Sequence, residues 1–451
     1  MAGFEKRRID FVNGNIAKNL CLFALPIVAG EILQNLYNSV DSLVVGRYVS
    51  DSALAAVSVC SNLSNLIIAA FNGLTIGNTV VIGQVVGRGE KDSINRYVKI
   101  IFTFSVLLGV SLSVLGVFFA PQLISLTAAQ DDIYDVAMTY LRIYLSGIMF
   151  TVIYNCGAGS LRALGDSVSP FNILCISSVL NIVLDFCFVK YLNLGVFGVG
   201  LATVLAQSLS AFMIYRAICK HTNSGAIDIK ALFSEGWPVI GKALKIGIPP
   251  SFYGAFLAVS NVFVWRYINA FSTAEVAGIG VAIKVEKFTT VCSKGFGNAM
   301  TAYASQNVGA KKYDRIKKGI WVCIIMNCAV VLFIGFIITF FSEPIVGLFD
   351  SNPAVIAAGS AMLLWLCPFY PFVSIREVLS GALRAKGKTV ITTILALGGM
   401  VVIRQIFLYF AAKSNMGITM IYLAYPVGWV VSSTLIVVYY FIVRKSYYTE
   451  E

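Results

Sequence analysis

Acidic and amide side chains recur along one face of the first long apolar segment. They are three or four residues apart, which places them on one side of a helix. The series consists of Glu31, Gln34, Asn38 and Asp41, with Tyr37 among them. An unpaired carboxylate at the centre of a membrane helix costs about 2.5–3.5 kcal/mol on insertion scales, so this face should border protein or a water-filled path. The pattern is typical of a transport route.

A second polar face lies in the fifth apolar segment. Ser178, Asn181 and Asp185 follow one another at steps of three and four residues and therefore share one side of a helix. Carboxylate, amide and hydroxyl oxygens suit a hard cation such as sodium, whereas a pair of acids can also hold a proton. The residue types alone leave the choice between H+ and Na+ open.

The composition predicts a membrane protein. Hydrophobic residues make up 58% of the 451 residues and charged residues only 12%, and the mean hydropathy is +0.82. A soluble domain has roughly 25% charged residues, so this chain could not hydrate a soluble surface. At roughly 20 residues per crossing, we expect twelve transmembrane helices, over 16–45, 53–83, 95–120, 133–158, 167–190, 196–219, 241–268, 276–305, 316–341, 354–381, 389–412 and 417–443. The fold class is therefore all-α and polytopic.

The net charge of +12 follows a topological pattern. Nearly all basic residues fall in alternate loops and at the two ends, while the intervening loops carry few. By the positive-inside rule this places both termini in the cytoplasm of a multi-pass protein of the cell membrane, the inner membrane where there are two. Nucleic acid is excluded as a partner, and contact with anionic lipid is expected. The few basic residues of the opposite side are Arg47, Lys190, Arg266 and Lys413.

Two carboxylates should meet in the outer half of the membrane. Asp41 lies six residues before Arg47, and Asp185 lies five before Lys190. Each interval is about 7–9 Å of helix, so the two acids lie at a similar depth and could face each other. Two hydroxyl side chains enter their helices at roughly the same level, about 10 Å from the outer end: Tyr140 and Thr203.

The pair Asp41 and Asp185 could couple an ion to movement. Two neighbouring carboxylates in a low dielectric cannot both stay ionised cheaply, so one retains a proton or a cation bridges them. Binding or release of the proton or cation changes the net charge of the pair and therefore the cost of burying this helix face, so the helix can bend or close. Pro26 removes a backbone hydrogen bond from the same helix. The alternative is that each aspartate only bonds a neighbouring backbone group.

The chain repeats itself once, at a constant offset in residue number. Leu161-Arg162-Ala163-Leu164-Gly165 returns as Leu383-Arg384-Ala385-Lys386-Gly387, and Gln84-Val85-Val86-Gly87 returns as Gln306-Asn307-Val308-Gly309. The interval from Leu161 to Leu383 defines the repeat offset, and Gln84 and Gln306 are separated by the same interval.

The repeat predicts the domain organisation. Six crossings return the chain to its starting side, so we expect two six-helix lobes related as parallel repeats. The predicted lobes are 1–219 and 241–451, joined by a cytoplasmic linker at 220–240. At the repeat offset Asp41 and Asp185 fall on Phe263 and Phe407, so the second lobe lacks both acids.

Enzymatic chemistry has little support. The ten cysteines show no CxxC spacing, and the one histidine, His221, lies at a polar linker. No HExxH motif and no phosphate-binding loop ending in Gly-Lys-Ser/Thr is present. We therefore expect no enzyme, no cofactor beyond a coupling ion, and no metal site except a sodium ion held at the acidic pair. One chain encloses the expected cavity, so a monomer is the expected state.

The chain resembles the multidrug and toxin extrusion family. The resemblance lies in Ala24-Leu25-Pro26 followed by Asn38-Ser39-Val40-Asp41, in the two glycine-containing turns and in the twin Leu-Arg-Ala-x-Gly loops. Asn181 with Asp185 resembles the DinF-like bacterial branch. The resemblance implies a proton or cation site and nearby cavity residues, and efflux of drugs or metabolites, often cationic, by alternating access driven by an inward H+ or Na+ gradient. The implied ion site is Asp41, Asn181, Asp185 and Thr203, and the implied cavity neighbours are Tyr140 and Asn155.

Several alternatives stay open. A lipid-linked saccharide flippase of the same superfamily is the second functional hypothesis, although such proteins usually carry more than twelve helices. Where other branches place a glutamate in the seventh helix, this chain has uncharged residues such as Tyr253. Glu377, which aligns with Asn155 by the repeat, serves either structure or substrate contact. Salt bridges within the second lobe are the favoured role of the charges in the eighth segment: Lys284, Glu286, Lys287 and Lys294.

Overall fold

The computed structural model is helical throughout the part of the chain that it describes. It describes residues 8–125, 131–222 and 225–448, except the side chains of 38, 42, 51, 52, 54, 55, 59, 61–70, 72, 131, 132 and 445–448. No strand occurs in these ranges. The expectation of an all-α chain is confirmed there.

The chain divides into two compact units. Unit 1 contains Ala29–Ile248 together with Arg8 and Ile9, and unit 2 contains Asp10–Val28 and the chain from Pro249 onward. Relative to the predicted lobes 1–219 and 241–451, residues 10–28 pack with unit 2, and residues 241–248 pack with unit 1. The first and seventh long helices therefore each contribute to both units. Both divisions fall close to prolines, Pro26 and Pro249.

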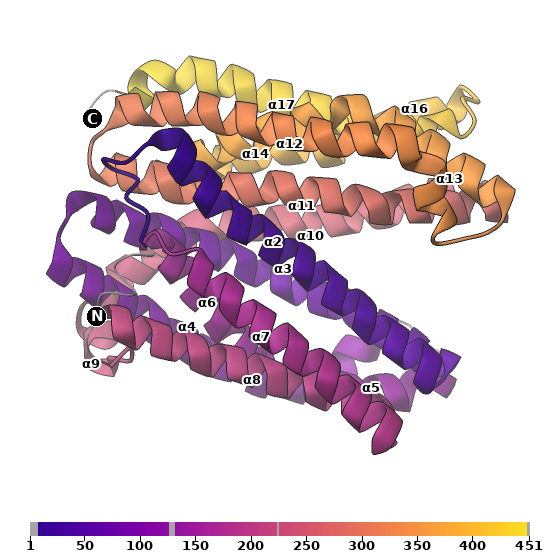
Figure 1. Cartoon of the computed structure of the whole chain (residues 1–451), viewed down its shortest axis with the longest axis horizontal. Coiled ribbons are helices and arrows are strands. Elements are labelled where there is room, and N and C mark those ends of the chain that lie inside the picture. The colour runs from indigo at the N-terminus through magenta and orange to yellow at the C-terminus, as the bar shows by residue number, and fades with distance from the viewer. Residues whose placement is uncertain (1–7, 126–130, 223–224, 449–451) are drawn as a thin grey trace. The chain divides into compact units, whose positions relative to one another are not determined.

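Six long helical segments begin in the first half of the chain, and most of their residues belong to unit 1 (Figure 1). They are α2 (Ile16–Tyr48), α3 (Asp51–Arg88), α4 (Lys91–Ser125), the pair α5 (Asp131–Ser146) and α6 (Ile148–Ala163), α7 (Val168–Asp185) with the π-helical turn η1 (Phe186–Tyr191), and α8 (Gly195–Thr222). The predicted linker is itself helical in part, as α9 (Ile229–Ala231) and η2 (Leu232–Gly236). Arg96 of α4 forms an ion pair with Glu235 of η2.

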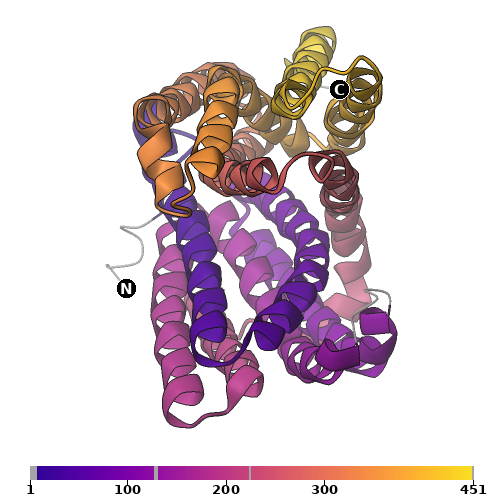
Figure 2. The same ribbon diagram turned by 90° about the vertical axis from the view of Figure 1, so that its right-hand side faces the viewer.

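Six further segments follow, and they form most of unit 2 (Figures 1 and 2). They are α10 (Trp237–Ile268), α11 (Thr273–Gly309), α12 (Tyr313–Gly347), α13 (Pro353–Leu366) with η3 (Cys367–Phe369) and α14 (Tyr370–Ala385), α15 (Thr389–Leu397) with the π-helical η4 (Gly398–Ile403) and α16 (Arg404–Lys413), and α17 (Thr419–Tyr448). In unit 2, α11 and α14 pack side by side, and α14 also contacts α12 and α17.

The helix bounds reproduce the repeat seen in the sequence. The bounds of α6 (Ile148–Ala163), shifted by the repeat offset, are those of α14 (Tyr370–Ala385), and α4 maps onto α12 in the same way. The loops that follow α6 and α14 both contain a glycine with positive φ, at Gly165 and Gly387. Only glycine adopts this backbone readily, which explains the repeated Leu-Arg-Ala-x-Gly motif. The duplicated six-helix architecture is therefore visible in the structure.

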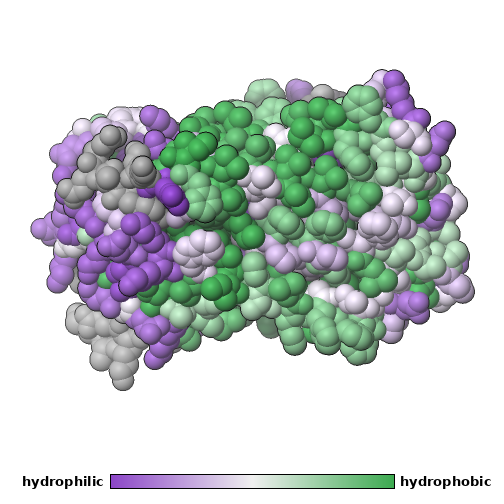
Figure 3. Space-filling view, turned by 90° about the horizontal axis from the view of Figure 1, so that it is seen from above, coloured by the Kyte–Doolittle hydropathy of each residue, from purple (hydrophilic) through white to green (hydrophobic). Residues whose placement is uncertain are grey.

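The twelve predicted crossings all correspond to helical segments. Within the described ranges, nine segments are long and apolar enough to span a membrane, and the pair α5 and α6, bent by 43°, makes a tenth. The two remaining predicted crossings are α3, with 38 residues, several of whose side chains lie outside the described residues, and α11, with 37 residues, which carries Lys284, Glu286, Lys287 and Lys294. Figure 3 shows hydrophobic side chains over most of the visible face and hydrophilic side chains gathered toward its ends. This distribution is that of a multi-pass membrane protein.

A glycine lets two helices of unit 1 approach closely. A Cβ atom on Gly247 of α10 would overlap the carbonyl group of Gly73 on α3, so only glycine fits there. In unit 2, Gly295 of α11 has the same role against Val28 of α2. Gly73 and Gly295 correspond to each other at the repeat offset. The same position of the repeat therefore anchors the exchanged helix end in each unit.

Candidate functional site

Asp41 of α2 and Asp185 of α7 lie side by side in unit 1. The two carboxyl groups are within hydrogen-bonding reach of each other. Asp185 is fully buried, and Asp41 is 9% exposed. Asp185 is the last residue of α7, and the π-helical turn η1 begins at the next residue. A π-helical turn shifts side-chain directions by one residue and is frequent at functional sites.

Few hydrogen-bond donors of the protein reach these carboxyl groups. Within the described ranges, both oxygens of Asp185 and Oδ1 of Asp41 accept no hydrogen bond from an amide or hydroxyl donor. No bond from either of these groups to a neighbouring backbone amide is found there, so the capping alternative has no support. A carboxylate only accepts hydrogen bonds, so two carboxyls that share one must hold a proton, and a bound cation is the other way to neutralise them.

A small pocket lies one helical turn from the acidic pair, at Tyr37 and Asn181, and neither aspartate is among its lining residues. Its empty volume is about 220 Å³, counting the part that opens to solvent. Asn181 and Thr203 line it, and both polar atoms of the Asn181 amide are buried without a hydrogen-bond partner in the described part of the chain. The Thr203 hydroxyl donates to the Val199 carbonyl at 3.0 Å and keeps its lone pairs for another group. The remaining lining residues are Tyr37, Leu174, Ser177, Ser178, Ala206 and Gln207.

Two tyrosines border this polar region. Tyr37 is 9% exposed, lines the pocket and is hydrogen-bonded to Gln34, one turn earlier on α2. Tyr140 of α5 is buried within electrostatic range of both aspartates, and its ring stacks on Tyr144 with centroids 6.3 Å apart. The structure therefore places Tyr37 and Tyr140 near the acidic pair, and Gln34 next to Tyr37.

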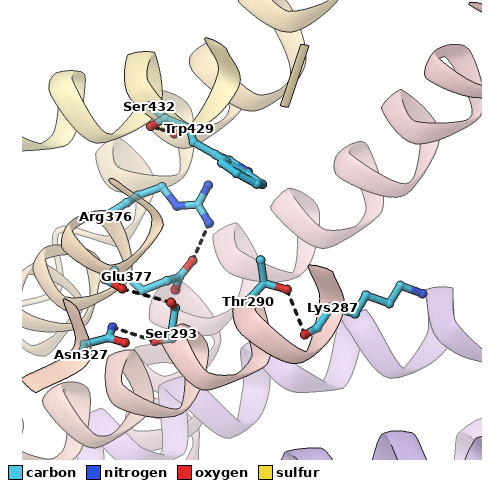
Figure 4. Close-up of polar contacts among 9 residues, drawn as sticks. Lys287, Thr290, Ser293, Asn327, Arg376, Glu377, Trp429 and Ser432 are labelled. Carbon is cyan, nitrogen blue, oxygen red and sulfur yellow. Dashed lines mark hydrogen bonds and ion pairs between the residues drawn. The ribbon is translucent and has the colours of Figure 1, made fainter. Parts of the chain in front are cut away.

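Not every candidate joins the pocket. Asn155 of α6 is half-buried, does not line the pocket, and donates to the Thr151 carbonyl at 2.8 Å. The side chain of Asn38 lies outside the described residues. Glu377 belongs to unit 2, where Nη2 of Arg376 donates to its Oε1 at 2.8 Å. Figure 4 shows this bond next to the contacts of Ser293 and Asn327.

Two polar residues of the pocket went unnoticed in the sequence. Gln207 follows Thr203 by one helical turn on α8, and Ser177 directly precedes Ser178 on α7. The i, i+4 spacing of Thr203 and Gln207 was a usable signal, because such residues share a helix face. Nothing in the pattern marked Ser177, whose hydroxyl donates to the Leu174 carbonyl at 3.1 Å.

One sequence expectation about the eighth segment is wrong. Glu286 of α11 makes no salt bridge within 4.0 Å to the lysines of its own helix in the described part of the chain. It is buried, while Lys284, Lys287 and Lys294 are exposed. Lys287, Lys294 and Arg376 act on Glu286 only over a longer range. The side chains diverge because the lysine stems extend away from the buried side of α11.

The loop between α6 and α7 contains a separate polar cluster in unit 1. The carboxylate of Asp166 accepts from the Ser169 hydroxyl at 2.6 Å and from the Ser169 amide at 2.9 Å, and His221 lies 3.5 Å away. Arg8 lies on the other ring nitrogen of His221, at 2.7 Å. Burial alone would raise the pKa of Asp166, but the hydrogen bonds from His221 and Ser169 outweigh it and lower the pKa.

Comparison with known proteins places these features in a family. The model of the family described as MatE matches residues 26–187 and 250–410, which together exceed half of the chain. The chain belongs to the MatE family, the multidrug and toxin extrusion transporters. The two matched segments correspond to the two repeats. The all-α polytopic fold is thereby confirmed, whereas the DinF-like branch stays a prediction that rests on Asn181 and Asp185.

MatE relatives match nearly the whole chain. The probable multidrug resistance protein YpnP of Bacillus subtilis is 27% identical over 88% of this chain and 89% of its own length. A protein named FAD transporter of Shewanella oneidensis is 24% identical over 84% of each chain. The structure of a MOP superfamily transporter from Pyrococcus furiosus, described as having a binding pocket of reverse polarity, has a TM-score of 0.90 at 21% identity and covers 98% of this chain and 99% of its own.

Proposed function

We propose that this chain is a secondary active antiporter that exports small organic molecules by alternating access, driven by an inward gradient of H+ or Na+. The observation that carries the proposal is the buried pair of Asp41 and Asp185 in a MatE chain. Burying two adjacent carboxylates without neutralisation is costly, so the loaded and unloaded pair favour different helix arrangements. Binding energy at the pair is then available to drive the change of access.

The surrounding groups suit an ion or a proton and not an organic substrate. The oxygens of Asn181 and Thr203 could complete the shell of a sodium ion, while two carboxyls this close to each other can share a proton. The pocket near the pair is small against the roughly 300–1,000 Å³ typical of drug-sized ligands. We therefore assign the coupling ion to this pocket and place the substrate elsewhere in the cavity, with Gln34, Asn38 and Asn155 along its path.

The relatives support small organic molecules as substrates. Two relatives in Bacillus subtilis are named as probable multidrug resistance proteins, and the relative in Shewanella oneidensis is named as a transporter of FAD. No feature of the described residues favours the alternative of a lipid-linked saccharide flippase. The chain is a transporter and not an enzyme in this proposal. It acts as a monomer in the cell membrane with both termini in the cytoplasm, in contact with lipid.

Transport into proteoliposomes under separately imposed gradients tests this proposal. A pH gradient and a sodium gradient are each applied without the other, and accumulation of ethidium and of FMN is followed by fluorescence. We expect one of the two gradients to drive accumulation of at least one probe in the wild type, and Asp41→Asn to reduce its initial rate about tenfold or more. Accumulation by Asp41→Asn at the wild-type level under both gradients would refute the role of the pair.

A further inference from the structure

Unit 2 contains a group of charges of the opposite sign, several of them buried. Each cation is within electrostatic range of at least one of two acids, Glu286 of α11 and Glu377 of α14. The cations come from three elements, and we refer to them with the two acids as the basic cluster: Lys287 and Lys294 of α11, Arg376 and Arg384 of α14, and Arg404 of α16. Its arginines lie in helical segments that meet the criteria for membrane spans.

Arg376 is only partly neutralised by its neighbour. It is 6% exposed, and its Nη2 donates to Glu377. Its Nη1 is buried without a hydrogen-bond partner among the described residues. In Figure 4 the guanidinium extends from α14, with one terminal nitrogen on Glu377 and the other turned away from that carboxylate. A guanidinium presents five N–H donors in a fixed plane, so Arg376 keeps donors for another acceptor.

Arg404 is the most deeply buried cation of the cluster. It is 1% exposed, and its Nη2 donates to the Ser260 hydroxyl at 2.7 Å and to the Asn261 amide oxygen at 2.9 Å. Both acceptors are neutral, and in the described part of the chain Nε of Arg404 has no partner and no carboxylate lies within salt-bridge distance. The π-helical segment η4 ends directly before Arg404, just as η1 begins directly after Asp185 in unit 1.

One hydroxyl group lies within electrostatic range of all three arginines. Tyr253 of α10 is an electrostatic neighbour of Arg376, Arg384 and Arg404 alike. Its Oη is buried and has no hydrogen-bond partner within the described ranges. A phenol next to guanidinium groups can donate to the same acceptor that they bind. Tyr253 lies in α10, the seventh long helix, in which other branches of the family place a glutamate.

The charges of the cluster do not cancel. Three arginines stay protonated at any physiological pH and face two carboxylates, so a positive surplus exists even before Lys287 and Lys294 are counted. Ionised side chains within membrane segments are costly, are therefore rare, and mark substrate or ion pathways. A purely structural set of ion pairs would need one acid for each arginine, and the cluster supplies fewer. The surplus calls for an anionic partner that is not part of the protein.

We propose that the basic cluster binds the phosphate or carboxylate group of the transported molecule, so that the substrate is an organic anion and not the organic cation expected from the family resemblance. Arg376 and Arg404 supply the donors, since a planar guanidinium matches both oxyanions. Glu286 and Glu377 neutralise part of the positive charge of the cluster, and the charge that remains matches one anionic group. This inference rests on the proposed transport function and specifies its substrate class.

Equilibrium binding to the purified full chain in phosphatidylcholine nanodiscs tests the site. The probes are FMN and riboflavin, which share a ring system and differ by one phosphate group, and ethidium as a planar cation. We expect FMN to bind at least about tenfold more tightly than riboflavin, because a hydrogen-bonded charged group adds to the affinity. Equal affinity for FMN and riboflavin, or preferential binding of ethidium, would overturn the proposal.

Three substitutions connect the binding to the cluster. Arg376→Gln should weaken FMN binding about tenfold or more, and Arg376→Lys should weaken it less, because lysine keeps the charge but loses the planar fork. Glu286→Gln should tighten FMN binding, since it removes a competing negative charge and is isosteric. The exposed Arg266 of α10 provides the matched control, and Arg266→Gln should leave binding unchanged. Weaker FMN binding in Glu286→Gln would contradict the assignment even if Arg376→Gln failed to fold.

Two further measurements complete the test. One distinguishes a substrate from a lipid headgroup as the source of the anionic group, and the other distinguishes the anion site from the antiporter function. Replacing part of the phosphatidylcholine by phosphatidylglycerol should leave FMN affinity unchanged; displacement of FMN would assign the cluster to a lipid headgroup and overturn its role in substrate binding. FMN binding that depends on Arg376, without gradient-driven transport of either probe, would leave the site standing and refute the antiporter. Gradient-driven ethidium transport that requires Asp41, with no FMN binding, would do the reverse.

Discussion

The acidic pair of unit 1 and the basic cluster of unit 2 occupy two copies of one scaffold and carry opposite charge. At the repeat offset, Asp41 and Asp185 correspond to Phe263 and Phe407, while Arg404 corresponds to Ile182. No cation is among the described groups that act on the two aspartates, whereas the acids of unit 2 face several. The duplication preserved the helices and their ends, and the buried charges diverged except at Arg162 and Arg384.

The comparison separates what stabilises the scaffold from what gives each unit its chemistry. Caps, tight turns and close helix contacts recur at the same offset in both units because they satisfy backbone groups, which every copy has. Apart from Arg384, whose counterpart at the repeat offset is Arg162, the buried charges do not recur, because each needs its own partner or ligand. We infer a division of labour in which unit 1 holds the coupling ion and unit 2 holds the anionic group of the substrate.

The largest expected effect concerns the two aspartates as a unit. Asp185→Asn should reduce gradient-driven transport about tenfold or more, in line with coupling free energies of about 1–3 kcal/mol. Combining it with Asp41→Asn should add little, because residues that share one ion act together and their effects are not additive. Initial rates of probe accumulation in proteoliposomes provide the measurement.

The control for that experiment is a similar residue outside the pocket. Asp135 of α5 is exposed, and Asp135→Asn should transport like the wild type. If the double variant lost the product of the two single effects, the aspartates would act independently. The contrast between a coupled acidic pair in unit 1 and a ligand site in unit 2 would then be withdrawn.

A smaller effect is expected at Asp166, for which unit 2 has no equivalent, since the corresponding residue is Lys388. The hydrogen bonds of His221 and Ser169 lower the pKa of Asp166 against the effect of burial. A lowered pKa stabilises the fold above the ordinary aspartate value of 3.8, and this stabilisation is lost as the pH falls through the lower pKa of the folded protein.

Asp166→Asn should therefore destabilise the protein by about 1–2 kcal/mol at pH 7, because Ser169 loses a charged acceptor. The difference from the wild type should shrink as the pH approaches 3. Thermal unfolding in detergent at both pH values measures it, with Asp135→Asn as the exposed control. A difference that stayed constant down to pH 3 would show that the carboxylate charge is not responsible.

The smallest expected effect compares two equivalent helix caps. Ser50 accepts from the Ala53 amide at 3.1 Å at the start of α3. Ser272, its counterpart at the repeat offset, accepts from the Glu275 amide at 3.4 Å at the start of α11, and Glu275 accepts in return from the Ser272 amide at 2.9 Å. The second cap is reciprocal, so it satisfies two backbone donors where the first satisfies one.

Replacing either serine by alanine should cost about 0.5–1 kcal/mol, and Ser272→Ala should be the more costly of the two. Glu275→Ala should remove most of the difference between the caps. The shift in unfolding midpoint of each variant, measured in the same detergent, decides the order. A larger loss of stability in Ser50→Ala than in Ser272→Ala would mean that packing around the first turn of α3, and not its cap, determines the stability of that helix end.

Much of this architecture was determined by the sequence alone. Long apolar segments, the alternating basic loops and the internal repeat predicted twelve helical segments in two copies, because crossing a membrane requires about 20 apolar residues each time. The i, i+4 spacing of Asn181 with Asp185, and the matching depth of Asp41, predicted the acidic pair. Such spacings are reliable predictors because the geometry of a helix determines which residues share a face.

Tertiary structure alone decided how the helices and charges combine. Nothing in the residue pattern indicated that residues 10–28 pack with unit 2, or that Asn155 would not line the pocket. The expected salt bridges of Glu286 do not form within the described residues. Arg376 and Arg404 lie within electrostatic range of Tyr253, although the three residues come from helices far apart in the chain. Helical spacing determines direction around one axis, but only the packing of several helices determines which buried charges meet.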